Sequence, residues 1–367
     1  MGPGRPKATL KRGFMRAIDF EDVVRSAYRV MLNRPPESDT VVSRWAETCE
    51  SLDVFYRAML ESAEFQFGRQ PAQQSPFWHY NSMFNAEDLI RKFAASNLVA
   101  RPGYIVNFLG VAVDPKFLPS VLADRQGTIE DIPIPANWHA DIAEWAAALR
   151  AVELSSSTFK MVELGCGWGC WMNNTGVAAR SLGKRVHLIG IEGDPGHCDF
   201  ARESLAVNGF KESEVTLVQG IAAAHGGTAL FPRQSEEVDS WGLGPVIGAT
   251  PEQRVAAAAT HIELPMYALA DVVADQDRID LLHIDIQGGE ADLVADCIDV
   301  LSSKFAYLLI GTHSRPIEGA LFQTLEEAGW IQEIERPAIN CFIDGRPWVA
   351  VDGVQGWRNP RLLPPMQ

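Results

Sequence analysis

The sequence predicts an α/β protein in which a mostly parallel sheet ends in an antiparallel hairpin and is preceded by a small all-α domain. Three observations lead to this prediction. From residue 158 onward, short apolar runs alternate with segments of helical periodicity, which is typical of a parallel sheet with helices on both faces. Asp344-Gly345 is a hairpin-turn signal near the C-terminus. Residues 18–68 show helical periodicity alone.

The length of 367 residues is enough for two domains. We divide the chain into a basic tail (1–17), expected to be disordered, a small helical domain (18–70), a helical region (71–150) that either covers the next domain as a lid or only connects, and the α/β domain (151–367). A net charge of −15 argues against nucleic acid as a partner. No apolar run approaches the roughly 18 residues of a membrane span. The six scattered cysteines show no zinc spacing, so we expect a cytoplasmic protein.

The helical domain is expected to contain three helices. Asn33-Arg34-Pro35-Pro36 ends the first, Trp45 lies in the second, and Ser51 caps the third. This segment resembles the small helical domain related to phycobilisome linkers that is often fused to bacterial glycosyltransferases and methyltransferases. The resembling residues are Ala27 to Pro35, Trp45 and Leu60 to Phe65. The resemblance implies an interaction or positioning module, with a possible protein partner bound through residues 18–68.

The α/β domain follows a helix expected over His139 to Leu149. The expected strands are Phe159–Leu164, Val186–Ile191, Val215–Val218, Leu281–Ile286, Phe305–Ile310, Ile331–Ile334 and Trp348–Val351. Asp194 caps one intervening helix, and Ser314 opens another. A long insertion over about 221–265 carries Asp239-Ser240-Trp241-Gly242-Leu243-Gly244, which predicts either a substrate-facing flap or a surface excursion with a buried tryptophan.

The most informative motif is the glycine turn after the first strand. It reads E-x-G-x-G-x-G from Glu163 to Gly169, and glycine lets a ligand approach the backbone closely. A nicotinamide-binding turn needs G-x-G-x-x-G, and Cys170 stands where its third glycine belongs. The spacing fits S-adenosylmethionine better, because an acid on the strand can face its cationic amino group. A nicotinamide oxidoreductase remains a weaker alternative.

Polar residues follow the other strands, where ligands of open α/β sheets bind. Glu192, after the second strand, can accept both hydroxyls of a ribose, and Gly220 and Ile221, after the third, can contact adenine. His283 and Asp285 point to one side of the fourth strand.

His313 follows the fifth strand. Its ordinary pKa of about 6.5 suits the removal of a hydroxyl proton.

Residues 158–352 resemble the FkbM-type S-adenosylmethionine-dependent methyltransferases, which have a Rossmann-like class I methyltransferase sheet. The resembling segments are Val162 to Gly169, Ile191 to Pro195 with Asn208, Asp280 to Glu290, and Gly311 to Ser314. With the strand-end residues, the expected cofactor-binding set is Glu163, Gly165, Cys166, Gly167, Trp168, Glu192, Gly193, Gly220, Ile221 and Asp285. The resemblance places Asp285 and His313 at the reacting centre, and such enzymes commonly methylate hydroxyl oxygens.

Two residues depart from the family pattern, which usually has Glu at Gln287 and often Lys at His283. Asp285 has no adjacent second acid, so a metal is not expected, although it is not excluded. We therefore expect O-methylation of a saccharide, glycolipid or related natural product, with His313 as the proton acceptor, Asp285 or His283 orienting it, and S-adenosylhomocysteine as the product. The alternative is a catalytically silent scaffold that acts through its N-terminal helical domain.

Overall fold

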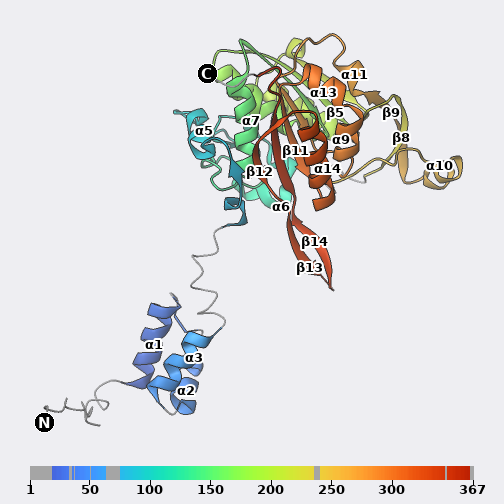
Figure 1. Cartoon of the computed structure of the whole chain (residues 1–367). Coiled ribbons are helices and arrows are strands. Elements are labelled where there is room, and N and C mark those ends of the chain that lie inside the picture. Colours follow the sequence, from blue (N-terminus) through green and yellow to red (C-terminus); the bar gives the residue numbers. More distant parts are fainter. Residues whose placement is uncertain are drawn as a thin grey trace, which may run out of the picture. The chain divides into compact units, whose positions relative to one another are not determined.

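The computed structural model describes residues 19–32, 35–36, 38–49, 51–62, 75–234, 240–343 and 345–363. The predicted tail over 1–17 lies outside these residues. The chain divides into two compact units, Met1–Ser75 and Pro76–Gln367, each of which is described by itself (Figure 1). Within the described residues, no helix is long and apolar enough to cross a membrane.

In its described residues, the first unit has three short helices around a small apolar core. They are α1 (Phe20–Met31), α2 (Asp39–Thr48) and α3 (Leu52–Glu61). Ser51 caps α3 as predicted, because its side chain accepts a hydrogen bond from Val54 N. Trp45 packs edge-on against the buried Phe55, and its Nε1 donates to the hydroxyl of Tyr28 over 3.1 Å. The predicted helix-ending segment around Asn33 and Arg34 lies partly outside the described residues.

The second unit is built on an eight-stranded sheet, which confirms the predicted fold class. Its strand order is β1-β12-β15-β11-β10-β4-β5-β6. The strands are β1 (Asn81–Ser82), β12 (Ile331–Arg336), β15 (Gly353–Arg358), β11 (Tyr307–Thr312), β10 (Leu281–Ile284), β4 (Thr158–Leu164), β5 (Arg185–Glu192) and β6 (Val215–Gln219). Strands β11, β10, β4, β5 and β6 pair in parallel, whereas β15 runs antiparallel between β11 and β12.

Helices cover both faces of this sheet. The side chains of β4 point to two apolar cores on opposite faces of the sheet. Phe159 and Met161 belong to one core, and Val162 and Leu164 belong to the other. The helices whose buried residues join the first cluster include α5 (Ala86–Phe93), α7 (Ile142–Leu154) and α8 (Cys170–Ser181), with α9 (Pro195–Val207) contributing Leu205. The second cluster includes residues of α11 (Leu269–Val272), α12 (Glu290–Asp296), α13 (Ile298–Lys304) and α14 (Arg315–Glu327).

The part of the predicted linker or lid region that the structure describes belongs to the same compact unit as the sheet. Helix α7 starts after Asp141, which forms a capping box with Glu144. Besides α5 and α7, this region contains η1 (Pro76–Trp78), β2 (Ile105–Val106), β3 (Ala112–Val113), η2 (Pro115–Phe117), α6 (Pro119–Leu122) and η3 (Ala123–Arg125).

The long insertion forms a small sheet of its own. It contains β7 (Ile221–Ala223), β8 (Gly227–Pro232), α10 (Pro251–Ala257) and β9 (His261–Ala268), with the short η4 (Glu212–Glu214) preceding β6. Asp239, the first residue of the predicted flap, lies outside the described residues. Ser240 to Gly244 are described, and they approach the cavity discussed below.

The predicted C-terminal hairpin is present, but its place in the fold differs from the prediction. β13 (Ile339–Ile343) and β14 (Arg346–Val351) form a separate antiparallel ribbon that projects from the sheet (Figure 1). The strand that completes the sheet is instead β15, which is buried throughout. Its sequence, Gly-Val-Gln-Gly-Trp-Arg, lacks the apolar alternation by which strands are recognised.

Candidate functional site

A cavity of about 770 Å³ lies at the carboxyl ends of β4, β5 and β10. The residues predicted for the site line it with one exception, His313. Those that line it are Glu163, Gly165, Cys166, Gly167, Trp168, Glu192, Gly193, Gly220, Ile221, His283 and Asp285. We call the part lined by Gly165 to Trp168, Glu192, Gly193, Gly220 and Ile221 the glycine end, and the part lined by Trp138, His139, Glu144, His283 and Asp285 the aromatic end.

Glycine is required in the turn for two reasons, the backbone conformation and the close approach of other segments of the protein. Gly165, Gly167 and Gly169 have φ values of +73°, +51° and +74°, which side-chain-bearing residues rarely adopt. A Cβ on Gly165 would overlap the backbone carbonyl of Asp285, and one on Gly167 would lie 3.2 Å from the ring of Trp241. Gly165 therefore lets two loops touch, a role that the sequence alone did not indicate.

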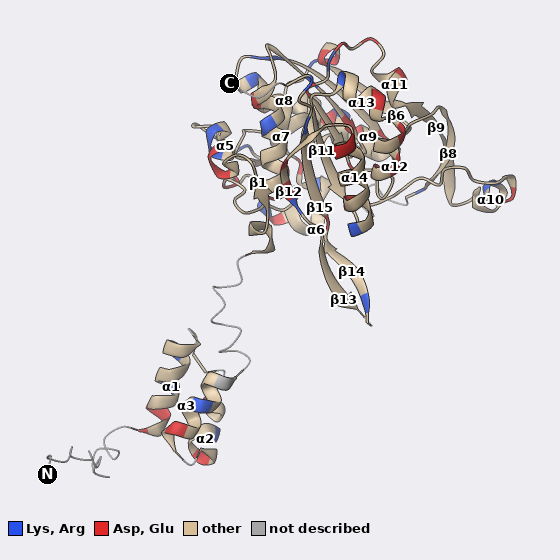
Figure 2. Ribbon diagram, in the orientation of Figure 1, with Lys and Arg blue, Asp and Glu red and all other residues tan. Residues whose placement is uncertain are grey.

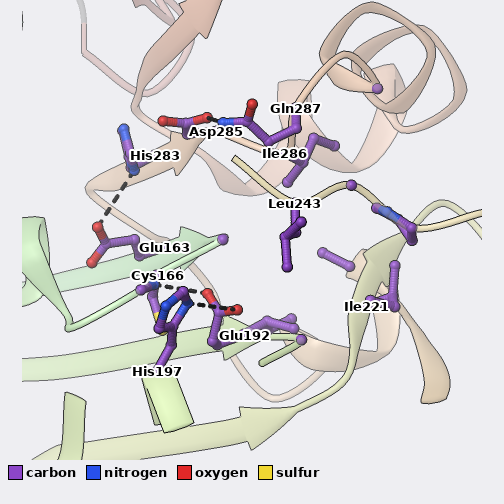
Figure 3. A pocket seen from close by; sticks show the side chains of 18 of the residues that line it. Glu163, Cys166, Glu192, His197, Ile221, Leu243, His283, Asp285, Ile286 and Gln287 are labelled. Carbon is purple, nitrogen blue, oxygen red and sulfur yellow. Dashed lines mark hydrogen bonds and ion pairs between the residues drawn. The ribbon is translucent and has the colours of Figure 1, made fainter. Parts of the chain in front are cut away.

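Glu163 is buried at the end of β4, and both of its carboxylate oxygens have protein partners. They accept hydrogen bonds from the backbone N–H groups of Trp171 (3.1 Å) and Met172 (2.9 Å), at the start of α8. Strand register places His283 beside Glu163, with Nδ1 and Oε1 3.5 Å apart (Figure 3). Glu163 thus fixes the start of α8 and lies beside His283 without a hydrogen bond to its Nδ1. The expected contact with an amino group stays a prediction.

Glu192 connects the ends of β4 and β5. One carboxylate oxygen accepts from Gly167 N and the other from Asp194 N, each over 2.8 Å. Asp194 caps α9 as predicted, by accepting from His197 N over 2.9 Å. The ring of His197 stacks on Trp241, with centroids 4.0 Å apart and planes within 1°. The described part of the insertion therefore lies directly over the glycine turn.

His313 lies between two carboxylates. Its Nε2 is 3.2 Å from Asp285 Oδ1, and its Nδ1 is 3.1 Å from Oε1 of the fully buried Glu290. Burial alone would lower the pKa of His313, but Asp285 and Glu290 outweigh burial and raise that pKa to about 10. The ring is therefore cationic at neutral pH. This charge state does not fit the proton-accepting role predicted for His313.

Asp285 itself lines the cavity and is two-fifths exposed, with 41% of its side-chain surface accessible. Burial raises the pKa of Asp285, but contacts with His313, the charge of His283 and a hydrogen bond from Gln287 Nε2 (3.0 Å) lower it overall. Asp285 is thus an ionised carboxylate at neutral pH. Gln287, the first family departure, has a φ of +60° and donates to this carboxylate.

A metal was not expected because Asp285 has no adjacent second acid in the sequence. In the structure a second acid does lie close to it. Glu290 folds back, accepting from Ile286 N and Gly288 N, so that Asp285, Glu290 and His313 offer ligand atoms within 4.8 Å of one another. The two carboxylates, however, face opposite nitrogens of the His313 ring. In this structure the cationic ring lies between the two carboxylates and balances part of their charge.

The aromatic end includes residues from the region before β4 that the sequence did not single out. These are Phe117, Leu118, Trp138, His139 and Glu144. Burial lowers the pKa of His139 to about 3, so this imidazole is neutral. Burial and the neighbouring charge of Asp141 raise the pKa of Glu144 to about 8. The capping-box spacing of Asp141 and Glu144 is visible in the sequence, but it indicates a helix start rather than a cavity wall.

The chain is similar in sequence to known methyltransferases. The family described as "Methyltransferase FkbM domain" matches residues 160–330. A relative from Jannaschia sp. (strain CCS1), named "Putative methyltransferase", is 44% identical over 279 residues, which is 76% of this chain and all of the relative. The predicted resemblance of residues 18–70 to phycobilisome linkers is not part of the family match and stays a prediction.

Solved structures with a similar fold include two precorrin-6Y C5,15-methyltransferases. The enzyme from Geobacter metallireducens GS-15 is 12% identical, with a TM-score of 0.32, and the match covers 57% of this chain and 86% of that one. The C-terminal domain of the enzyme from Rhodobacter capsulatus is 14% identical, with a TM-score of 0.34, and the match covers 60% and 89%. At these values the likeness concerns the fold alone.

Proposed function

Because the chain belongs to the FkbM methyltransferase family, we propose that it transfers the methyl group of S-adenosylmethionine to a hydroxyl oxygen of a saccharide, glycolipid or related natural product. One observation carries this proposal. A single cavity has a glycine turn tied to Glu192 at one end, and His283 and Asp285 at the other. The first group suits a nucleoside with a cationic tail, and the second suits a hydroxyl that must lose its proton.

The residues at the glycine end fit S-adenosylmethionine. Glu192 is buried at the edge of β5 and can accept hydrogen bonds from both ribose hydroxyls. Gly220 and Ile221 line the adjacent wall, where adenine would lie. The acids around the turn favour a cation. When bound, this cofactor supplies a methyl group on a sulfonium, and the protein has mainly to align the acceptor oxygen with it.

His283 is better placed than His313 to take the acceptor proton. It lines the cavity, whereas His313 does not, and its Nδ1 faces Glu163. Among the described residues, the buried Nδ1 of His283 has no hydrogen-bond partner, which leaves the ring available to bind the acceptor hydroxyl. His313 would then act as a positioning residue, whose positive charge holds Asp285 ionised beside the acceptor.

The test combines calorimetry with turnover. We expect the full-length protein to bind S-adenosylmethionine and S-adenosylhomocysteine, whereas a scaffold would bind neither and an oxidoreductase would bind NAD. His283→Ala should slow methyl transfer by about 100-fold or more and leave cofactor affinity nearly unchanged. His313→Ala should also slow transfer, and His313→Lys, which keeps a positive charge, should restore part of it. If His283→Ala keeps its activity and His313→Lys restores none of the activity lost in His313→Ala, the role of base returns to His313.

A further inference from the structure

Acids dominate the charged lining of the cavity. Among its described lining residues there are six carboxylates and no lysine or arginine, the acids being Glu144, Glu163, Glu192, Asp285, Asp292 and Asp296. Figure 2 shows Lys and Arg on outer elements such as α5 and β14. Such walls make the electrostatic potential inside negative.

Several of these acids have protein partners, but Glu144 at the aromatic end has spare capacity. Its Oε2 accepts a hydrogen bond from Asp141 N over 3.1 Å. No described residue contacts its Oε1, which belongs to a cavity-lining side chain. Arg336 is a nearby cation, but it is buried in an ion pair with Asp141 and does not line the cavity. Among the described residues, no guanidinium is therefore available there to meet an anion.

The cofactor tolerates this arrangement because of its own charges. Its sulfonium and ammonium groups are cations, and its carboxylate is balanced by the ammonium on the same carbon. A phosphate, sulfate or carboxylate on the acceptor would have no such internal partner. It would lie near the ionised Asp285 in a partly desolvated space, where like charges cost several kcal/mol.

Neutral hydroxyl groups, by contrast, match the aromatic end. An ionised carboxylate only accepts hydrogen bonds, and a hydroxyl can donate one. Asp285 is such an acceptor, with 41% of its side chain exposed. The half-buried Trp138 supplies a flat apolar face, against which the C–H face of a sugar ring can pack.

We propose that the unit that receives the methyl group is a neutral polyhydroxy compound, such as an uncharged sugar, and that phosphorylated, sulfated or carboxylated units are rejected. This inference rests on the proposed function and narrows its substrate class. It excludes sugar phosphates and nucleotide-linked sugars as acceptors.

The first experiment identifies the charge of the product. Full-length protein is incubated with tritium-labelled S-adenosylmethionine and a cell extract, and the labelled products pass over an anion-exchange column at neutral pH. We expect the label in the unretained fraction, with no change after phosphatase treatment of the extract. Label that is retained on the column and lost after phosphatase treatment overturns the inference. If no fraction is labelled although calorimetry shows cofactor binding, the proposed function itself fails, and the substrate class with it.

The second experiment uses the neutral acceptor found in this way and its phosphorylated derivative. We expect kcat/KM to be about 100-fold lower for the phosphorylated compound, which corresponds to the several kcal/mol of charge repulsion above. Above pH 8, where Glu144 is ionised, Glu144→Gln removes one negative charge at nearly constant volume and should narrow this gap. Equal kcat/KM for the two compounds in the wild-type protein overturns the inference, as does a gap that widens in the variant.

Discussion

The two ends of the cavity are built in different ways. The glycine end is made mainly of backbone, from one turn at residues 165–169 and the next strand end at Glu192. The aromatic end is made of side chains from distant parts of the chain, including Trp138, Glu144 and His283. A short local motif is enough for the end that we assign to the cofactor. The end that we assign to the methyl acceptor depends on residues that only the tertiary fold brings together.

Gly165 is where the two ends meet, so its replacement should have the largest effect. Gly165→Ala places a Cβ against the carbonyl of Asp285, in a backbone conformation unfavourable to alanine. We expect a loss of at least about 4 kcal/mol in the free energy of unfolding and loss of cofactor binding. Gly183→Ala is the matched control, because Gly183 has a φ of +74° but a Cβ added to it would meet nothing within 4 Å. Gly183→Ala should lower the free energy of unfolding by only about 1 to 2 kcal/mol. Equal losses for the two variants in thermal unfolding would show that the contact between Gly165 and Asp285 does not limit stability.

Glu192→Gln tests the glycine end alone. A glutamine has one acceptor oxygen in place of two, so it cannot keep both hydrogen bonds, from Gly167 N and Asp194 N, that Glu192 accepts. We expect about 100-fold weaker binding of S-adenosylhomocysteine by calorimetry, since a hydrogen bond to a charged group is worth about 1.5 to 3 kcal/mol. Asp194→Asn keeps the cap on α9 and should bind almost as the wild type does. An unchanged affinity in Glu192→Gln would contradict the assignment of this end.

Glu144→Gln tests the aromatic end alone. The pKa of Glu144 is raised to about 8, so this carboxyl loses its proton as the pH rises through that value. An ionised carboxylate accepts a hydroxyl hydrogen bond more strongly. We therefore expect KM for the acceptor to fall roughly 3- to 10-fold between pH 7 and 9 in the wild type, and to stay level in the variant. The KM for S-adenosylmethionine serves as the internal control, and a parallel change in it would place Glu144 at the wrong end.

His313→Gln should change the stability of the fold in a way that depends on pH. The pKa of His313 is about 10 in the folded protein and about 6.5 when unfolded. Its ion pairs therefore stabilise the fold fully below about pH 6.5, and this contribution is lost as the pH rises toward 10. The deficit in Tm of the variant should be largest at pH 6 and nearly absent at pH 10. A deficit that is the same at both values would show that the charge of His313 contributes nothing.

His187→Gln supplies a control of opposite sign. Burial lowers the pKa of His187, so its neutral form stabilises the fold above about pH 6.5 and this contribution is lost as the pH falls. The Tm of His187→Gln relative to the wild type should therefore rise at low pH.

The sequence was sufficient for most of the central sheet, because its strands are short apolar runs separated by clear helix caps. The predicted and observed bounds of β4, β5 and β6 differ by one residue at most. β15 was missed because it contains two glycines and a buried glutamine. Gly356 is needed there because a Cβ would lie 2.6 Å from Ile334 Cγ2, a constraint that arises only when β12 packs alongside.

The candidate site divides in the same way. The glycine end could be predicted from local spacing, since Gly165 and Glu192 each lie at the end of a strand. The contacts of His313 could not, because they depend on Glu290 folding back onto Ile286 N and Gly288 N. Glu144 carries only the signal of a helix start, and the packing of α7 against the sheet brings it to the cavity; Trp138, just before this helix, carries no motif.

The stack of Trp241 on His197 gives the molecule its own optical reporter. A neighbouring imidazole changes the emission of an indole, and the change depends on whether the two rings stay in contact. Any small molecule that enters above the turn and parts the rings alters the fluorescence of this one tryptophan among ten. Replacing Trp241 by phenylalanine identifies that contribution, so occupancy can be followed in solution without a radioactive or coloured label.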